Sequence, residues 1–155
     1  MAALQKVTPF LWFDGNAEEA ARFYTSIFED SRIEELVRAG ADGPASSVTF
    51  RIAGLQLIAF NGGPHFPFTP AVSLFVHCDT QSEVDRLWEA LSAGGEPGRC
   101  GWLKDRFGLS WQIVPSVLGP LLHDRDREKA KRVMTAMLKM SKLDIGELQR
   151  AYEAA

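Results

Sequence analysis

The sequence predicts an α+β fold that consists of two βαβββ modules followed by a C-terminal helical tail. Strand-like and helix-like patterns follow one another in the order strand, helix, strand, strand, strand, and this order occurs twice. Residues of the second half repeat those of the first at a constant offset, beginning with Thr8 and Ser73. After Pro115 the apolar residues recur at helical spacing. These three observations define the fold class.

The first module is expected to span about residues 7–61. It begins with a strand at residues 7–13, which is an aromatic and β-branched run. A helix should follow, because Asn16 and Glu19 are spaced like a capping box and apolar residues then recur at helical spacing. Three further strands are expected after this helix, separated by turns that contain glycine. They cover residues 33–38, 47–52 and 56–60.

The second module is expected to span about residues 71–115 and to repeat this order in a shorter version. Its first strand should cover residues 72–78. Thr80 and Glu83 form a second capping box, so the second helix is expected to begin there. Three more strands follow and complete the module. They lie near residues 96–99, 101–104 and 109–114.

The internal repeat indicates how the two modules are arranged. Chance similarity between two strand-helix units is the alternative, but a capping box at the start of the helix in both halves argues against it. The aligned pairs are Thr8 with Ser73, Phe10 with Phe75, Trp12 with His77, Asp14 with Asp79 and Glu18 with Glu83. A unit of this size cannot bury both faces of its sheet alone, so we expect the modules to pack together around a shared cup. A concave site of this kind is where a ligand is expected.

Length and composition favour a single domain at residues 1–123. The 155 residues are 46% hydrophobic and 24% charged, enough for one core and too few for two ordinary domains. A net charge of −3 offers no basic surface to a phosphate backbone, so we expect no nucleic-acid partner.

No apolar run approaches the roughly 20 residues of a membrane span, so no membrane partner is expected. Two cysteines are too few for a disulfide framework, which favours the reducing cytoplasm.

Residues 124–155 are expected to form a helical extension. Eight basic and six acidic residues give this segment a net charge of +2. One helical face should carry its apolar side chains, and Asp144 with Glu147 should start a second short helix. The apolar positions are Ala130, Val133, Met134, Met137 and Leu138. This face could pack on its own domain or on a partner subunit, and an interaction protein that works through the tail is a further alternative.

Alternation along the strands predicts which side chains face the cup. Every second residue of a strand points to the same side, and the positions between them are uniformly apolar and should face the helices. The cup-facing positions are Thr8, Phe10, Trp12, Ser73, Phe75, His77, Ser110, Gln112 and Val114. Asn61, at the end of the fourth strand, is interpreted as the first-module counterpart of Gln112.

Several longer motifs resemble a known family. A strand followed by Asp14, the Phe23-Tyr24 pair and Asp105-x-x-Gly108 before the last strand resemble the vicinal oxygen chelate superfamily, which includes glyoxalase I, extradiol dioxygenases and bleomycin-resistance proteins. Four runs resemble, more narrowly, its PhnB-like group, often labelled 3-demethylubiquinone-9 3-methyltransferase. The runs cover residues 60–66, 77–80, 94–96 and 100–113. The resemblance implies the glyoxalase/bleomycin-resistance-like fold for residues 7 to about 115.

The resemblance also implies four metal-facing positions, namely Thr8, Asn61, Ser73 and Gln112. Metalloenzymes of the superfamily place His, Glu or Gln there, because imidazole or charged oxygen ligands must repay the desolvation of a divalent cation. Two hydroxyls and two carboxamides are poor substitutes for these ligands. We therefore expect neither a metal nor another cofactor.

These observations favour a protein that binds a small aromatic or apolar molecule. The hypothesis includes the case in which this protein is a metal-independent enzyme. His77 is the candidate catalytic acid or base, because an imidazole titrates near neutral pH. The candidate ligand-binding residues are Thr8, Phe10, Trp12, Asn61, Ser73, Phe75, Cys100, Trp102 and Gln112. Phe60 is expected in the wall of the same pocket. The superfamily resemblance implies a homodimer.

Two other activities are alternatives to the small-molecule hypothesis. A divalent-metal enzyme of the glyoxalase or dioxygenase type would need unusual ligands, drawn from His77, Gln112 and Asn61. A genuine methyltransferase would need a glycine-rich turn that leads into a helix N-terminus, whereas the Gly62-Gly63 turn leads to Pro64. We therefore expect no S-adenosylmethionine binding.

Overall fold

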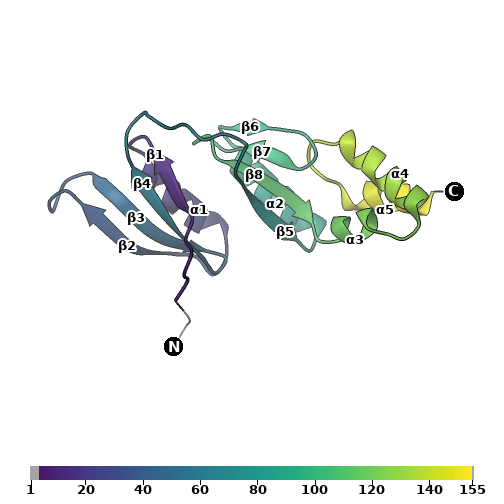
Figure 1. Cartoon of the computed structure of the whole chain (residues 1–155), viewed down its shortest axis with the longest axis horizontal. Coiled ribbons are helices and arrows are strands. Elements are labelled where there is room, and N and C mark those ends of the chain that lie inside the picture. Colours follow the sequence, from purple (N-terminus) through teal and green to yellow (C-terminus); the bar gives the residue numbers. More distant parts are fainter. Residues whose placement is uncertain (1–3, 155) are drawn as a thin grey trace. The chain divides into compact units, whose positions relative to one another are not determined.

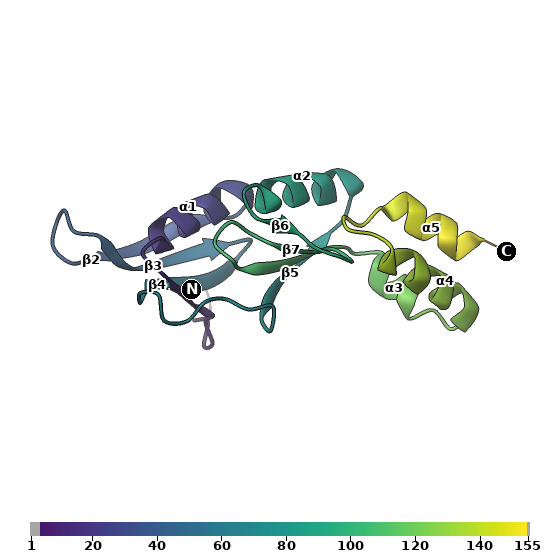
Figure 2. The same cartoon turned by 90° about the horizontal axis from the view of Figure 1, so that it is seen from above.

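The computed structural model describes residues 4–154 and contains two compact units with a boundary between Phe68 and Thr69. Each unit holds one four-stranded sheet with a helix on one face, as Figures 1 and 2 show for α1 and α2. The predicted α+β class and the repeated βαβββ order are therefore confirmed. No helix within residues 4–154 has the length and apolar character that crossing a bilayer requires.

The first unit has the strand order β1-β4-β3-β2. Its strands β1 and β4 pair in parallel, and the other neighbours pair antiparallel. A parallel pair needs a crossover, which here runs through α1, β2 and β3. The elements are β1 (Phe10–Phe13), α1 (Ala17–Ile27), β2 (Arg32–Arg38), β3 (Ala45–Ile52) and β4 (Leu55–Asn61).

Small side chains allow α1 to lie close to the first sheet. Ala17, Ala20 and Ala21 are fully buried, as is Tyr24 on the same face of the helix. The tyrosine ring stacks on Phe50, with 6.2 Å between the ring centroids. The alternating apolar positions of β1, β3 and β4 complete this core. They are Leu11, Phe13, Val48, Ile52, Leu57 and Ala59.

The second unit begins with the same arrangement in the order β5-β8-β7-β6. Strands β5 and β8 pair in parallel, and the remaining pairs are antiparallel. The elements are β5 (Ser73–Cys78), α2 (Gln81–Ser92), β6 (Glu96–Pro97), β7 (Trp102–Lys104) and β8 (Ser110–Pro115). Strand β6 is shorter than expected because a tight turn begins at Gly98, whose N–H donates to the Trp102 carbonyl at 2.8 Å.

The two predicted capping boxes have different outcomes. Thr80 caps α2, since its Oγ1 accepts a hydrogen bond from the Glu83 N–H at 3.1 Å. The Glu83 carboxylate in turn accepts from the Asp79 N–H at 3.0 Å. The box at Asn16 is wrong, because the Asn16 side chain makes no capping hydrogen bond to α1.

The C-terminal helices belong to the second unit, where they form a small core against β8. They are α3 (Leu118–Leu122), α4 (Arg127–Leu138) and α5 (Ile145–Glu153), of which α3 was not expected from the sequence. The buried members of this core are Val114, Leu118, Val133, Met140, Leu143 and Leu148. Of the two packing alternatives for the tail, contact with its own unit is therefore present.

The apolar face predicted for α4 is only partly buried. Ala130 and Val133 are buried, and Met137 packs against the core from a half-buried position. Met134 and Leu138 are 40% and 55% exposed, which corrects the expectation of one common packed face. The reason is geometrical, since these two residues lie further around the helix from Val133 than Ala130 and Met137 do.

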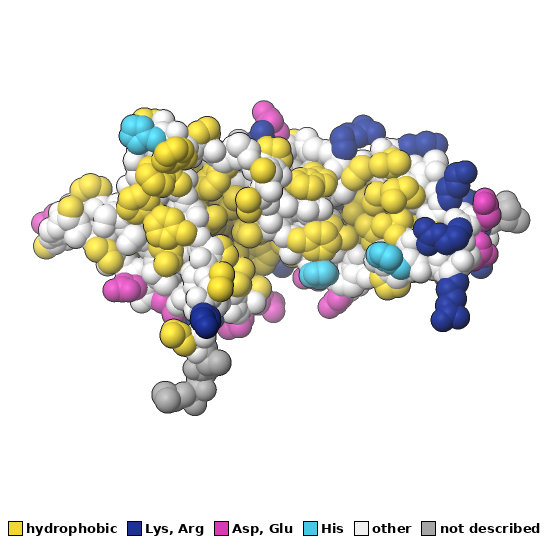
Figure 3. Space-filling model, viewed as in Figure 1, with side chains coloured by type: hydrophobic (Ala, Val, Ile, Leu, Met, Phe, Trp, Pro, Cys, Tyr) yellow, Lys and Arg dark blue, Asp and Glu magenta, His cyan; other side chains and the backbone are white. Residues whose placement is uncertain are grey.

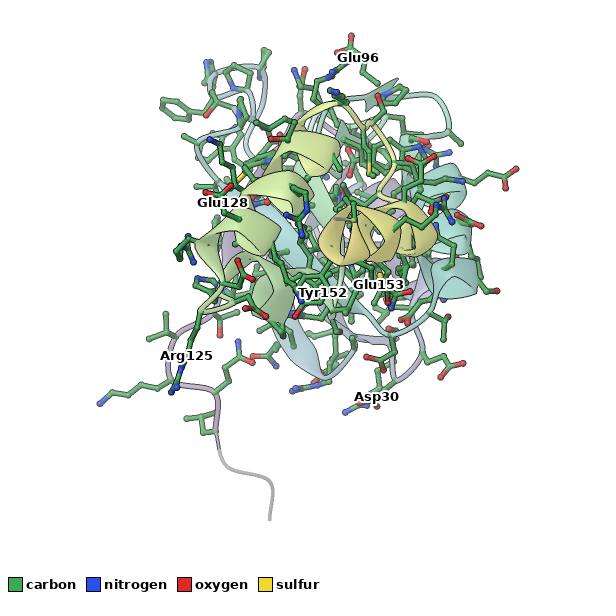
Figure 4. All side chains as sticks on the ribbon, turned by 90° about the vertical axis from the view of Figure 1, so that its right-hand side faces the viewer. Asp30, Glu96, Arg125, Glu128, Tyr152 and Glu153 are labelled. Carbon is green, nitrogen blue, oxygen red and sulfur yellow. The ribbon has the colours of Figure 1, made fainter. Side chains whose placement is uncertain are left out.

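Polar contacts fasten the C-terminal helices to the rest of the second unit. The Gln81 side chain of α2 donates to the Leu143 carbonyl at 3.0 Å and accepts from the Ile145 N–H at 2.7 Å. The Cys100 N–H donates to the Met140 carbonyl at 2.9 Å. Within the tail itself, Tyr152 of α5, labelled in Figure 4, donates its hydroxyl to Asp124 at 2.8 Å. The tail is thus a part of this unit with bonds to both helix and strand regions.

Candidate functional site

The open face of each sheet, opposite its helix, carries most of the candidate site residues. In the second sheet the strand register arranges this open face in rows that run across the strands. The first row is polar and consists of Ser73, Ser110, Lys104 and Glu96. The second row consists of Phe75, Gln112 and Trp102. The third consists of His77 and Val114, of which Val114 is covered by the C-terminal helices. Alternation in the single strands therefore predicted correctly which of these residues share a face.

Gln112 lies at the centre of this face, between Phe75 and Trp102 on the neighbouring strands. Its Nε2 donates a hydrogen bond to Ser73 Oγ at 3.0 Å. The side-chain oxygen of Gln112, Oε1, has no hydrogen bond to any other residue between 4 and 154 and remains available as an acceptor. Phe75 is 48% exposed, and its ring centroid lies 4.9 Å from that of His77. The centre of the open face is thus a carboxamide with aromatic neighbours.

A shallow recess of about 160 Å³ lies at the polar end of this face. Its lining residues are Pro70, Glu96, Pro97, Gly98, Trp102, Leu103, Lys104 and Ser110. Ser110 is only 2% exposed, whereas Glu96 and Lys104 are exposed at the rim. Glu96 and Lys104 were missed from the sequence, because their position beside Ser110 depends on the pairing of β6, β7 and β8. The alternation of β8 alone did place Ser110 on this face.

Aromatic rings cover the β1 and β4 side of the first sheet's open face. The Trp12 and Phe10 rings each contact Phe60, with centroids 5.1 and 5.4 Å apart. Trp12 also meets Phe66 edge to face at 4.9 Å, and Figure 3 shows hydrophobic side chains gathered over β1 and β4. The indole N–H of Trp12 donates to the Gly63 carbonyl at 2.9 Å. This surface is apolar, and the hydrogen-bonded indole is held in place.

Gly62 is required beside this aromatic surface. A Cβ atom built at Gly62 would lie 2.1 Å from a carbon of the Trp12 ring, a distance that no side chain can occupy. The glycine of the Gly62-Gly63 turn is thus explained by close approach to an aromatic side chain. It is not explained by contact with a phosphate-bearing cofactor.

The structure places Asn61 on the helix-facing side of the first sheet. Its Oδ1 accepts a hydrogen bond from the Ala17 N–H at the start of α1, and its Nδ2 donates to the Ala45 carbonyl, both at 2.9 Å. The register also corrects the expected equivalence with Gln112. Phe10 pairs with Ile58 as Phe75 pairs with Gln112, so the counterpart of Gln112 is Ile58. A ligand-binding role for Asn61 stays a prediction.

Replacing Asn61 with Ala is expected to lower the free energy of unfolding by about 1–2 kcal/mol, because the substitution removes a helix cap. Urea unfolding followed by circular dichroism measures this loss. Asn16→Ala is the matched control and should cost less than about 0.5 kcal/mol, since the Asn16 side chain caps nothing. Equal losses for the two variants would show that the capping bond of Asn61 is unimportant.

The four positions implied as metal-facing do not fit a divalent cation. Both ends of the Asn61 carboxamide are bonded to the backbone, and Thr8 Oγ1 accepts a hydrogen bond from Gln5 at 3.3 Å. Ser73 and Gln112 are bonded to each other. In the part of the chain that the structure describes, no three His, Cys, Asp or Glu side chains are grouped closely enough to hold a metal ion. The side chains at these four positions are therefore uncharged, and most of their polar atoms are already hydrogen-bonded within the protein.

The two cysteines lie outside the open faces. Cys78 is fully buried, and its removal from water, with Glu83 and Asp79 nearby, raises the pKa of its thiol to about 11. A thiol with this pKa is protonated and unreactive at neutral pH. Cys100 is half-buried in the turn before β7, with a positive φ of 56°. Its contact with a ligand stays a prediction.

The chain is similar to a group of proteins with known structures. The family model described as 3-demethylubiquinone-9 3-methyltransferase matches residues 5–114. A PhnB protein from Bacillus cereus, described by the same activity, is 36% identical with a TM-score of 0.66, over 72% of this chain and 99% of that chain. Protein PA1353 from Pseudomonas aeruginosa is 22% identical with a TM-score of 0.61, over 73% and 98% of the two chains.

A more distant similarity connects the fold to an antibiotic-resistance protein. The fosfomycin resistance protein FosX from Listeria monocytogenes, solved with Mn(II) and sulfate, is 18% identical with a TM-score of 0.53. The match covers 72% of this chain and 89% of FosX. No curated protein matches the chain. Residues 115–155, which hold α3, α4 and α5, lie beyond the family match.

Proposed function

Since this chain belongs to the family described as 3-demethylubiquinone-9 3-methyltransferase, within the vicinal oxygen chelate superfamily, we propose that it binds a small aromatic or apolar molecule. The observation that carries the proposal is the open face of the second sheet. There the Gln112 carboxamide lies between Phe75 and Trp102, with His77 in the next row. Apolar walls with one or two orienting polar groups are typical of small-molecule sites.

The methyltransferase label of the family does not extend, in our proposal, to S-adenosylmethionine. The common methyltransferase fold binds this cofactor at the carboxyl edge of a mostly parallel, doubly wound sheet. Each sheet of this chain instead contains a single parallel pair and antiparallel neighbours. The Gly62-Gly63 turn, which packs beside Trp12, leads to no helix N-terminus.

The proposal includes metal-independent catalysis, with His77 as the general acid or base. His77 is exposed, and its ring contacts Phe75 on the same face as Gln112. An imidazole in this place can exchange a proton with a ligand bound over Gln112. We further propose a homodimer in the reducing cytoplasm, a location supported by the presence of two free cysteines.

The test is a titration of the purified chain with a set of neutral planar aromatic compounds, followed by ligand-detected NMR. We expect saturable binding, weakened at least about fivefold by Gln112→Ala, since a buried hydrogen bond to the ligand is then lost. Gln149→Ala, at an exposed position of α5, is the matched control and should bind normally. Calorimetry with S-adenosylmethionine should give no binding.

Three outcomes would contradict this proposal. If none of the aromatic compounds binds, or if Gln112→Ala and Gln149→Ala bind them equally well, the open face of the second sheet is not the site. A micromolar affinity for S-adenosylmethionine would instead restore the activity that the family label describes.

A further inference from the structure

The polar row of the second sheet contains two opposite charges side by side. Glu96 of β6 and Lys104 of β7 are directly paired in the antiparallel register, so their side chains leave the same face of the sheet. Neither forms an ion pair or side-chain hydrogen bond with any other residue between 4 and 154. In Figure 4 the labelled Glu96 side chain lies at the rim of this unit. Both charges are thus available to a ligand.

Ser110 adds a buried polar group to the same place. It lies in register beside Lys104 and is 2% exposed, yet its hydroxyl has no hydrogen-bond partner among residues 4–154. Among residues 4–154, every side-chain oxygen or nitrogen that is fully enclosed has a hydrogen-bond partner. The Ser110 hydroxyl has none, so it is not fully enclosed and must reach the recess that Ser110 lines. A nearly buried hydroxyl without a partner is costly unless a ligand or water satisfies it.

The remaining walls of the recess are uncharged. Besides Glu96 and Lys104 they consist of Pro70, Pro97, Gly98, Trp102, Leu103 and Ser110. The cavity volume of about 160 Å³ is roughly half the lower limit of about 300 Å³ for a drug-sized pocket. The recess therefore suits a compound, or a part of one, that is small and carries both a positive and a negative group.

The aromatic row lies next to the polar row. Phe75 and Trp102 stand on the two strands that flank β8, about 9.6 Å apart at the normal strand spacing of about 4.8 Å. A ligand ring that rests on the Gln112 carboxamide would therefore have an aromatic side chain on either side, within reach of the roughly 4.5–7 Å centroid distances typical of ring contacts. The two rows are two residues apart along the strands, which corresponds to about 7 Å. Ring and charges are thus separated by the length of a short side chain.

We propose that the second sheet binds an aromatic α-amino acid, or a compound with the same ring and zwitterion. The ring lies over Gln112 between Phe75 and Trp102. Its ammonium group contacts Glu96, and its carboxylate contacts Lys104 and the Ser110 hydroxyl. This inference rests on the small-molecule function proposed above, and it names the ligand class for that site.

The experiment compares four related compounds by calorimetric titration of the full chain. L-phenylalanine carries both charges, 3-phenylpropionate lacks the ammonium group, 2-phenylethylamine lacks the carboxylate, and 2-phenylethanol is neutral. We expect L-phenylalanine to bind most tightly. Loss of either charge should weaken binding about five- to tenfold, as expected for one charged hydrogen bond at a partly exposed site.

Charge variants then assign each group of the ligand to a residue. Lys104→Gln should weaken L-phenylalanine and 3-phenylpropionate but not 2-phenylethylamine, and Glu96→Gln should do the reverse for the two single-charge compounds. Exposed residues of the same type provide the controls Lys139→Gln and Glu89→Gln, which should change nothing. Thermal unfolding verifies that the variants are folded. If one variant is not folded, the comparison of the four ligands still decides the test.

The failures of the two proposals can be told apart. If all four compounds bind within twofold of one another and the charge variants have no effect, the amino-acid inference is wrong, while the small-molecule function stands. If neither these compounds nor the neutral planar set binds, both proposals fail. Weakening of L-phenylalanine by Lys139→Gln as strongly as by Lys104→Gln would also overturn the inference, because a general charge effect would then explain the result.

Discussion

Replacing Asp105 with Ala is expected to lower the free energy of unfolding by about 3–5 kcal/mol, because three donors lose their acceptor in a buried place. Asp105 is 2% exposed and precedes β8. Its Oδ1 accepts from the N–H groups of Phe107 and Leu109, at 2.9 and 3.0 Å. Its Oδ2 accepts from the indole N–H of Trp111 at 2.9 Å. One carboxylate therefore shapes the turn and fixes the largest side chain of the core.

Urea unfolding followed by tryptophan fluorescence measures this loss. Asp105→Asn should cost less, since its carbonyl oxygen still accepts hydrogen bonds while its amide group cannot accept from the indole. Asp42→Ala, in an exposed turn of the first unit, is the control and should stay within about 0.5 kcal/mol of the unchanged protein. A small loss in Asp105→Ala would mean that water replaces the carboxylate without cost.

The strand faces were predictable because side chains alternate with a period of two, a property of each strand alone. This rule correctly placed Ser73, Phe75 and Gln112 on one face. The placement of Asn61 could not be predicted in the same way. It lies at the end of β4, and its carboxamide caps a helix that begins 44 residues earlier. Proximity in the sequence indicates Asn16 as the cap of α1. In the structure Asn61 provides this hydrogen bond instead, from a strand far along the chain.

The pairing of strands was likewise hidden from the sequence. Glu96 and Lys104 become neighbours only through the antiparallel register of β6 and β7. The short helix α3 was missed because its five residues are too few for a periodic signal and contain Gly119 and Pro120. Met134 and Leu138 were assigned to the packed face of α4 because apolar character does not by itself define which side of a helix is covered.

The register also indicates how the two halves of the repeat have diverged. Ile58 of the first unit and Gln112 of the second occupy the same place opposite Phe10 and Phe75. One side chain is apolar and the other is a hydrogen-bonding carboxamide. The first open face is therefore apolar near β1 and β4, whereas the second carries a hydrogen-bonding group at the equivalent position. Equivalent positions of the two sheets thus carry side chains of different chemistry.

Replacing Leu148 with Ala is expected to lower the free energy of unfolding of the second unit by about 2–5 kcal/mol, because it leaves a cavity in the core of the C-terminal helices. Leu148 is fully buried in a cluster that includes Val114 of β8. The neighbouring Leu143, also buried, accepts a hydrogen bond from Gln81 of α2. Helices beyond the family match are therefore expected to unfold together with the family's own sheet.

Parallel urea titrations by far-ultraviolet circular dichroism and tryptophan fluorescence distinguish a shared core from an independent tail. Trp102 and Trp111 belong to the second sheet, so a shared core requires both signals to shift to lower urea together in Leu148→Ala. Leu138→Ala removes the same side chain from a position that is 55% exposed. It should change the free energy of unfolding from either signal by no more than about 0.5 kcal/mol. If only the helical signal of Leu148→Ala moves, the tail unfolds by itself. The contacts through Val114 and Gln81 would then be too weak to couple it to the sheet.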